Sequence, residues 1–269
     1  MQFERSSAVA AKLVYLASTG STNTDLVRWA SGADSADWPD FTAVVAGEQT
    51  EGKGRSGREW VSPAGSSLSV SVLLTPQGLP LTSFGWFPLL AGLAMSETVA
   101  GLIDHGAAVG ASESQKVSVK WPNDVLVGER KISGILSELL PNLRGVVLGS
   151  GLNLTQTQDE LPIEAATSLA IAGATETEVD VVLARYLTNL KHWYLRLVEA
   201  GGDADAAGLR FAVVAACGSI GRQVRVILPG ERELRGLATN IDAAGRLIVD
   251  VAGVPTEVAA GDIVHLRHN

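Results

Sequence analysis

Hydrophobic and polar positions divide the chain into a large mixed region and a small β-rich region. Apolar runs bounded by turn residues predict three strands in the first part of the large region, at 12–17, 41–50 and 66–75. The run SSLSVSVLLT at 66–75 alternates polar and apolar residues, which predicts a half-buried strand. An apolar face of Leu26, Trp29 and Ala30 predicts a helix at 24–31. We expect Ser21 or Thr22 to cap this helix and Gly32 to end it.

The middle of the chain predicts two longer helices around a set of hairpins. Ser83 is a candidate N-cap for a helix that runs to about Asp104, with an apolar face made of Phe87, Leu90, Leu93, Ala94, Val99 and Leu102. Residues 116–139 predict three strands, and the turn at 128–130 joins the last two as a hairpin. A further strand is expected at 144–154. An amphipathic helix at 181–199 should stop at Gly201 and Gly202.

The composition changes near 206–221, and short strands separated by Gly, Pro and Asp follow. They are expected at 223–229, 233–242, 245–251 and 255–266, which predicts a β-barrel of about 50 residues. Helices and strands do not alternate regularly enough for a parallel sheet. We therefore predict an α+β fold with a mixed or antiparallel sheet, in two domains at 1–213 and 214–269.

Composition and charge narrow the class of protein. The 269 residues are 46% hydrophobic and carry a net charge of -8, which argues against a general nucleic-acid binder. The longest apolar run, 86–95, is too short to span a membrane, and charges near the start argue against a signal peptide. Cys217, the one cysteine, excludes an internal disulfide and fits a reducing cytoplasm. The four histidines show no metal-ligand spacing.

A basic glycine-rich segment, EGKGRSGREW at 51–60, is the first candidate for chemistry. Its glycines match G-x-G-x-x-G, yet a strand rather than a helix is predicted next, which argues against a dinucleotide fold. Arg58 and Glu59 stand where a Walker loop needs Lys and Ser or Thr, and the kinase strings HRD and DFG are absent. Such a loop in an acidic chain suits a small anion. The alternative is a solvated surface turn.

Five strings occur in an order that resembles the biotin protein ligase family. They are the segments at 21–23 (STN), 49–60 (QTEGKGRSGREW), 120–124 (KWPND), 131–138 (KISGILSE) and 149–153 (GSGLN). The resemblance runs from about residue 14 to the C-terminus. It implies a class II synthetase-like catalytic domain followed by a small SH3-like β-barrel. Because the first strand is expected near residue 12, it also implies a monofunctional member without an N-terminal DNA-binding domain.

The chain departs from the family pattern at two positions. Lys53 stands where the family usually has arginine, and Ser150 stands where it usually has an aliphatic residue. The second departure is expected to bring a hydroxyl to the ligand pocket.

The resemblance also implies a two-step reaction. Biotin and ATP form biotinyl-5′-adenylate and pyrophosphate, and a lysine of a biotin carboxyl carrier protein then takes the biotin. It implies Mg²⁺ with the ATP, a cytoplasmic location, and neither specific nucleic acid nor membrane as partner, and it allows a weak homodimer. We expect the C-terminal barrel to help ATP or acceptor binding.

The same resemblance implies a role for each matching residue. The catalytic set is Lys131, Arg55 and Lys120. The biotin-binding set is Ser21, Thr22, Asn23, Gln49, Lys53, Gly54, Arg55, Lys131 and Gly134. The ATP or adenylate set is Gly52, Arg58, Trp60, Asn123 and Asn153, with Asp124 near the metal or the incoming lysine.

From the residues themselves, plainer interpretations stay open. The segment 21–23 also reads as helix capping, 122–124 as turn chemistry, and Lys131 as a solvated hairpin lysine. Two rival functions remain as well: a lipoate or octanoate ligase of the related fold, and a non-catalytic protein that senses biotinyl-adenylate.

Overall fold

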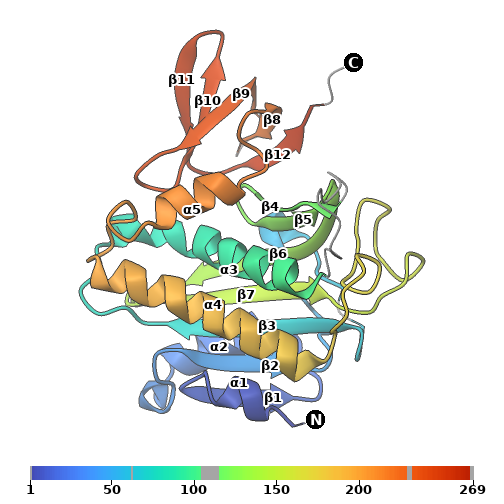
Figure 1. Cartoon of the computed structure of the whole chain (residues 1–269). Coiled ribbons are helices and arrows are strands. Elements are labelled where there is room, and N and C mark those ends of the chain that lie inside the picture. Colours follow the sequence, from blue (N-terminus) through green and yellow to red (C-terminus); the bar gives the residue numbers. More distant parts are fainter. Residues whose placement is uncertain (1, 62, 104–114, 229–231, 267–269) are drawn as a thin grey trace.

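The computed structural model describes residues 2–61, 63–103, 115–228 and 232–266 (Figure 1). A large α+β unit carries the N-terminus, and a smaller β unit follows it at the C-terminal end. Among the described residues, no helix is long and apolar enough to cross a membrane.

The large unit is built on a seven-stranded sheet with the strand order β1-β2-β3-β7-β6-β5-β4. The strands are β1 (Lys12–Leu16), β2 (Thr42–Ala46), β3 (Ser67–Leu74), β4 (Val117–Lys120), β5 (Asp124–Val127), β6 (Arg130–Leu139) and β7 (Val146–Asn153). β1 and β2 are parallel, and every other neighbouring pair is antiparallel. The predicted mixed sheet is confirmed.

Helices cover both faces of this sheet. They are α1 (Glu4–Ser7), α2 (Thr22–Ser31), α3 (Phe87–Leu102), α4 (Val179–Glu199) and α5 (Leu209–Ala216), with short 3₁₀ turns η1 (Ser35–Asp37), η2 (Arg55–Gly57) and η3 (Leu81–Trp86). α3 and α4 pack over one face of the sheet in the main core. α2 packs over the other face in a smaller cluster that includes Leu26 and Val44. Because α2 covers only part of its face, that face has room for a site.

The half-buried pattern predicted for 66–75 is wrong, because all eight residues of β3 are buried. Its apolar side, which includes Val70, faces the main core. Its serine side is covered as well: Ser71 lies within hydrogen-bond distance of Asn23 at the start of α2, and Gln49 donates to Ser69. The polar positions of the alternating pattern therefore face other polar side chains of the protein and not solvent.

Helix boundaries also differ from the predictions. Ser83 does not cap α3; its hydroxyl donates to the Pro80 carbonyl within η3, and α3 begins at Phe87. α3 ends at Leu102, and the predicted end near Asp104 falls outside the described residues. α4 begins at Val179, two residues before the predicted start, because the Glu178 carboxylate accepts from the first backbone N–H groups.

The C-terminal unit is an antiparallel five-stranded sheet with the order β11-β10-β9-β8-β12. Its strands are β8 (Gln223–Ile227), β9 (Glu233–Ile241), β10 (Leu247–Val251), β11 (Val254–Val258) and β12 (Asp262–His265). α5, which the sequence did not predict, precedes it and packs on α3 and α4. The division into domains at 1–213 and 214–269 stays a prediction.

Two tryptophans of the large unit fasten the C-terminal sheet. The Trp86 indole donates to the Ala243 carbonyl at 2.9 Å, and the Trp121 indole donates to the Gly245 carbonyl at 3.1 Å. Apolar residues of both units belong to one continuous core. The C-terminal sheet is therefore held against the end of the large sheet, beside β4.

Candidate active site

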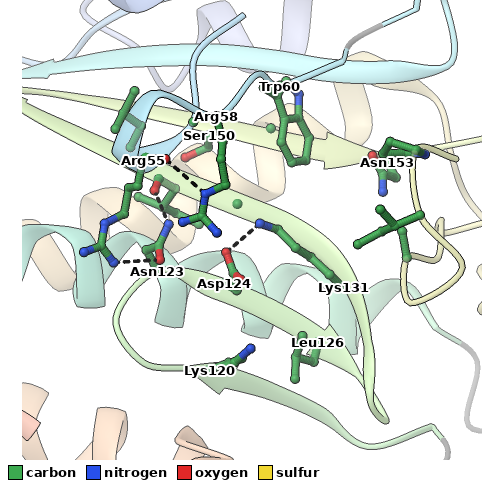
Figure 2. A pocket seen from close by; sticks show the side chains of 18 of the residues that line it. Arg55, Arg58, Trp60, Lys120, Asn123, Asp124, Leu126, Lys131, Ser150 and Asn153 are labelled. Atoms are coloured by element: carbon green, nitrogen blue, oxygen red, sulfur yellow. Dashed lines mark hydrogen bonds and ion pairs between the residues drawn. The ribbon is translucent and has the colours of Figure 1, made fainter. Parts of the chain in front are cut away.

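A cavity of about 1410 Å³ opens on the sheet face that α2 leaves free (Figure 2). Every residue predicted for the site lines it except Gly52, which lines an adjoining hollow. The five strings, widely separated in sequence, therefore meet at one place. The volume exceeds the 300–1,000 Å³ that is typical of a single small-molecule site.

The start of α2 supplies the polar end of the cavity. Ser21 caps the helix, since its hydroxyl accepts from the Thr24 N–H. The Gln49 amide oxygen accepts from the Thr22 N–H at 2.8 Å and from the Thr22 hydroxyl at 3.0 Å. Residues at the start of α2 therefore both cap the helix and line the cavity.

Asn23 ties the same helix to the centre of the sheet. Its amide nitrogen donates to Glu138 at 2.7 Å and to the Leu136 carbonyl at 3.2 Å, both on β6. The approach is close: a Cβ on Gly149 would lie 2.4 Å from the Asn23 oxygen. Glycine at 149 is therefore required for this contact.

Trp60 lies over a glycine floor made by two paired strands. Gly134 on β6 faces Gly151 on β7 in register, and a Cβ on Gly151 would lie 2.1 Å from the Trp60 ring. A Cβ on Gly134 would lie 3.2 Å from Lys131 Nζ. Trp60 Nε1 is buried against this floor and has no hydrogen-bond partner among the described residues.

Lys131 and Asp124 form an ion pair at the middle of the cavity. Their atoms Nζ and Oδ1 are 2.7 Å apart, and the side chains are 31% and 22% exposed (Figure 2). The Lys131 ammonium also lies 5.8 Å from the Trp60 ring centroid. The ammonium points into the cavity toward a carboxylate partner, which favours the predicted site role over a solvated hairpin lysine.

Lys120 lies next to this pair, because it is the register partner of Asp124 between β4 and β5. Burial lowers the pKa of Lys120, and the nearby Asp124 carboxylate partly offsets that effect. The turn between the two strands, with its cis Trp121–Pro122 peptide, presents Asn123. The Asn123 amide donates to the Ile135 carbonyl at 2.8 Å and so fixes its oxygen toward the cavity.

The glycine loop joins the large sheet to the C-terminal unit. Arg55 donates to the Asn123 oxygen at 3.1 Å and to the Gly261 carbonyl at 3.3 Å. Burial lowers the pKa of Arg55, opposed by the nearby Asp262 carboxylate. Arg58 forms an ion pair with the same Asp262 at 2.9 Å. Both arginines thus contact the segment that begins β12.

Backbone bonds fold this loop back on itself. The Gly54 N–H donates to the Arg58 carbonyl at 2.7 Å, and the Trp60 N–H donates to the Gly52 carbonyl at 2.8 Å. A Cβ on Gly52 would lie 2.3 Å from the Trp60 carbonyl oxygen, so this position requires glycine. The Lys53 ammonium donates to the Thr24 hydroxyl at the edge of the loop.

Asn153 holds the far end of the cavity. Its amide nitrogen donates to the Thr167 carbonyl at 2.9 Å, and its oxygen accepts from Gln156 at 3.3 Å. The residue thereby fixes the loop that follows β7. Its predicted contact with adenosine stays a prediction.

Ser150 is among the residues that line the cavity, but its hydroxyl is not directed at the ligand pocket as expected. Its hydroxyl lies 2.6 Å from the Tyr186 hydroxyl of α4, in the core. Neighbouring residues on a strand point to opposite faces, and the flanking Gly149 and Gly151 face the cavity. Ser150 therefore pairs with Tyr186, whose pKa is raised by burial.

The described residues contain no group of three or more His, Cys, Asp and Glu side chains that would hold a metal ion. Asp124 offers one carboxylate, and Lys131 already contacts it. Mg²⁺ in nucleotide sites is commonly held by one or two carboxylates together with substrate phosphates. The residues fit a metal that is bound mainly by a triphosphate.

The C-terminal unit lines one side of the cavity with residues that the sequence did not identify. Arg222 and His265 belong to this unit, and Glu129 in the turn between β5 and β6 faces them. No local string marked them, because the contact joins positions 93 residues apart. Only their meeting in the fold makes them candidates.

Comparison with known proteins gives the family. The model of the biotin/lipoate A/B protein ligase family matches residues 15–153, and the biotin protein ligase C-terminal domain matches 219–266. A biotin–[acetyl-CoA-carboxylase] ligase of Mycobacterium tuberculosis is 40% identical over 95% of this chain and 90% of its own length. A Paracoccus denitrificans protein of the same name is 31% identical over 87% of this chain and 92% of its own.

A solved structure agrees with these matches. The biotin protein ligase of Aquifex aeolicus in complex with biotin and ATP is 26% identical, with a TM-score of 0.75 over 96% of this chain and all of that one. Sequence matches across both units and a shared fold lead to one conclusion: the chain belongs to the biotin protein ligase family.

Proposed function

We propose that the protein is an ATP-dependent biotin ligase that forms biotinyl-5′-adenylate and then transfers biotin to a lysine of a biotin carboxyl carrier protein. The observation that carries the proposal is the Lys131–Asp124 pair inside the cavity, between the polar end at α2 and the cations of the loop. A carboxylate and a triphosphate are both anions, so the first step needs a cation where they meet.

The polar end suits the biotin head group. A ureido ring offers donors and an acceptor in a small space, and Ser21, Thr22 and Gln49 present hydroxyl and amide groups already fixed by mutual bonds. Groups that are fixed before binding lose little freedom when a ligand arrives. Asn23, Gly54 and Gly134 complete the biotin set in this proposal.

Lys131 serves the first chemical step. A carboxylate oxygen of biotin attacks the α-phosphorus, the bond from that phosphorus to the bridging oxygen breaks, and pyrophosphate leaves with the electron pair. The Lys131 ammonium neutralises the two reacting anions and the charge that develops on phosphorus. Lys120, a neighbour across Asp124, faces the triphosphate.

The loop holds the adenylate. Arg55 and Arg58 carry charge-assisted donors, Lys53 contacts biotin, and Trp60 gives an aromatic wall for the adenylate. Asn123 and Asn153 contribute amide groups, and Gly52 lets the loop close on Trp60. We expect the loop to become ordered around the ligand, which would keep the reactive anhydride from water.

The second step needs an acceptor amine near the adenylate carbonyl. The lysine nitrogen attacks the carbonyl carbon, AMP leaves with the carbon–oxygen bond electrons, and a proton is released from the amine. Mg²⁺ would enter with the triphosphate and neutralise phosphate charge in the first step. In this proposal Asp124, which contacts Lys131, would contact that ion or, in the second step, the incoming lysine. Cytoplasmic location, absence of specific DNA binding and a weak homodimer stay predictions.

A transfer experiment tests the proposal. The protein, ATP, Mg²⁺ and a carrier domain with one acceptor lysine should give a biotinylated lysine with biotin, and lipoate should neither replace nor inhibit biotin at equal concentration. Labelling by lipoate with none by biotin would point to the rival ligase. Tight binding of biotinyl-adenylate without any transfer would point to a sensing protein.

A further inference from the structure

On the side of the cavity formed by the C-terminal unit, Arg222 contacts two partners. Arg222 Nη1 lies 2.6 Å from Glu129 Oε1 and 3.4 Å from His265 Nδ1. Arg222 and Glu129 are 41% and 62% exposed, so the ion pair lies at the mouth of the cavity. Exposed ion pairs of this kind contribute little to stability, since water screens them.

The bond to His265 fixes the direction of the guanidinium. Arginine only donates, so Nδ1 accepts and the ring proton is on Nε2, which lies 3.0 Å from the Ser219 hydroxyl. Burial, with help from Lys120 and Arg222, lowers the pKa of His265 to about 4, which keeps the ring neutral. His265 and Glu129 therefore hold the Arg222 guanidinium beside the cavity.

The charges around the cavity exceed what its own carboxylates balance. Among the described residues, six Lys and Arg but three Asp and Glu line it, within a chain whose net charge is -8. Lys131, Lys120 and Arg222 all line the cavity, and His265, which contacts Arg222, is near enough to Lys120 for the two charges to interact. An anion longer than a single phosphate could therefore meet cations of both units.

We propose that Arg222 binds the terminal phosphates of the nucleoside triphosphate, and then the leaving pyrophosphate, with Glu129 as a counter-ion that the phosphates displace. This inference rests on the proposed function and adds a residue of the C-terminal unit to the first step. A guanidinium matches phosphate oxygens in two-pronged geometry, and a phosphate carries more charge than a carboxylate. The exchange of Glu129 for phosphate is therefore favourable.

Two substitutions that break the same ion pair separate this role from a structural one. Arg222→Gln should raise the KM for ATP, and the KM for pyrophosphate in the biotin-dependent exchange reaction, about tenfold to a hundredfold. Glu129→Gln frees the guanidinium and should lower both values by up to about fivefold. If the pair merely fastens the two units, both substitutions should change these constants in the same direction, and that result would overturn the inference.

Controls use the whole protein. Arg225→Gln removes a similar exposed pair, with Glu233 on the same sheet, and should leave the KM for ATP unchanged. Transfer from supplied biotinyl-5′-adenylate to a carrier domain involves no pyrophosphate, so Arg222→Gln should transfer at the wild-type rate. Equal loss in both reactions would indicate damage to the fold and contradict the assignment.

The wild-type exchange reaction separates the inference from the function beneath it. Its absence would remove both together. A wild-type protein that exchanges normally, alongside an Arg222→Gln variant with an unchanged KM for ATP and for pyrophosphate, would remove the inference and leave the proposed function in place.

Discussion

Lys131 illustrates how one side chain gains its meaning from position. At the start of β6 it is an ordinary lysine by type; taken alone it is compatible with a solvated hairpin lysine, and only its sequence string predicts a site role. The fold directs its ammonium inward, 2.7 Å from Asp124 and over the glycine floor below Trp60. A charge already fixed in this way needs no reorganisation when the phosphates react.

Lys131→Ala should therefore slow adenylate formation about a hundredfold to a thousandfold, the usual effect of removing one preorganised charge, about 3 to 4 kcal/mol. Single-turnover formation of biotinyl-5′-adenylate measures it. Lys116→Ala, at an exposed lysine just before β4, is the matched control and should react normally. A near-normal rate for Lys131→Ala would return Lys131 to the role of a hairpin lysine.

The Ser150–Tyr186 pair gives a second prediction at the residue scale. Ser150→Val leaves the buried Tyr186 hydroxyl without its partner and should lower the free energy of unfolding by about 1 to 3 kcal/mol. Tyr186→Phe should have a similar effect. The double variant should recover much of the loss, because both polar groups are then gone. Urea unfolding of the four proteins measures the coupling, and strictly additive losses would contradict the pairing.

At the element scale, the glycine loop connects the site to the rest of the molecule. Its fold depends on residues that no other type can replace: a side chain on Gly52 would meet the Trp60 carbonyl at 2.3 Å. Its two arginines contact Asn123 and the segment that begins β12. The loop is thus fixed at its base and tied at its tip by contacts that a ligand phosphate could replace.

Arg55→Gly should release the adenylate too early. Losing one charge-assisted contact is worth about 1.5 to 3 kcal/mol, so adenylate dissociation should rise about tenfold to a hundredfold. The released anhydride should then label an unrelated bystander protein with biotin, which a blot detects. Ser56→Gly is the matched control, because Ser56 has a positive φ of 55° and glycine there adds freedom without removing a guanidinium. Acceptor-only labelling by Arg55→Gly, with a normal adenylate lifetime, would argue against the loop as a lid.

Elements with strong local signals were predictable, and their surroundings were not. Turn residues and apolar runs located the strands of the main sheet and the long helix α4. The alternation in β3 predicts a strand with one face in solvent, because the sequence does not show that α2 and Gln49 cover the serines. α5 was not predicted because its eight residues form a short, mostly apolar run, and periodicity over so few residues does not distinguish a helix from a strand. Serine is a common N-cap residue, but the Ser83 hydroxyl donates to the Pro80 carbonyl and does not cap α3.

At the scale of the whole molecule, the strings of the site were predictable because each is a short local sequence. The side of the cavity that the C-terminal unit contributes was not, because it depends on how the two units pack together. Trp86 and Trp121 set that meeting through loop carbonyls of the C-terminal sheet. Carbonyl acceptors leave no mark in a sequence, so the approach of Arg222 and His265 to Glu129 was not predictable.

The junction between the units should be sensitive to acid. The pKa of His265 is about 4 in the folded protein, below its ordinary 6.5, so the unfolded chain takes up the proton first as the pH falls. Stability should therefore fall between pH 6.5 and pH 4. Urea midpoints at neutral and mildly acidic pH should differ more for the wild type than for His265→Gln. An equal difference for both proteins would show that His265 does not titrate at the junction.

The central claim is that this cavity activates biotin with ATP. Biotin-dependent exchange of labelled pyrophosphate into ATP tests it most directly, because the reaction requires biotin, ATP and reversible adenylate formation but no acceptor protein. We predict exchange that depends on biotin and Mg²⁺, is absent with lipoate in place of biotin, and is strongly reduced in Lys131→Ala. Exchange with lipoate and none with biotin, or no exchange by a folded protein that binds both substrates, would contradict the account.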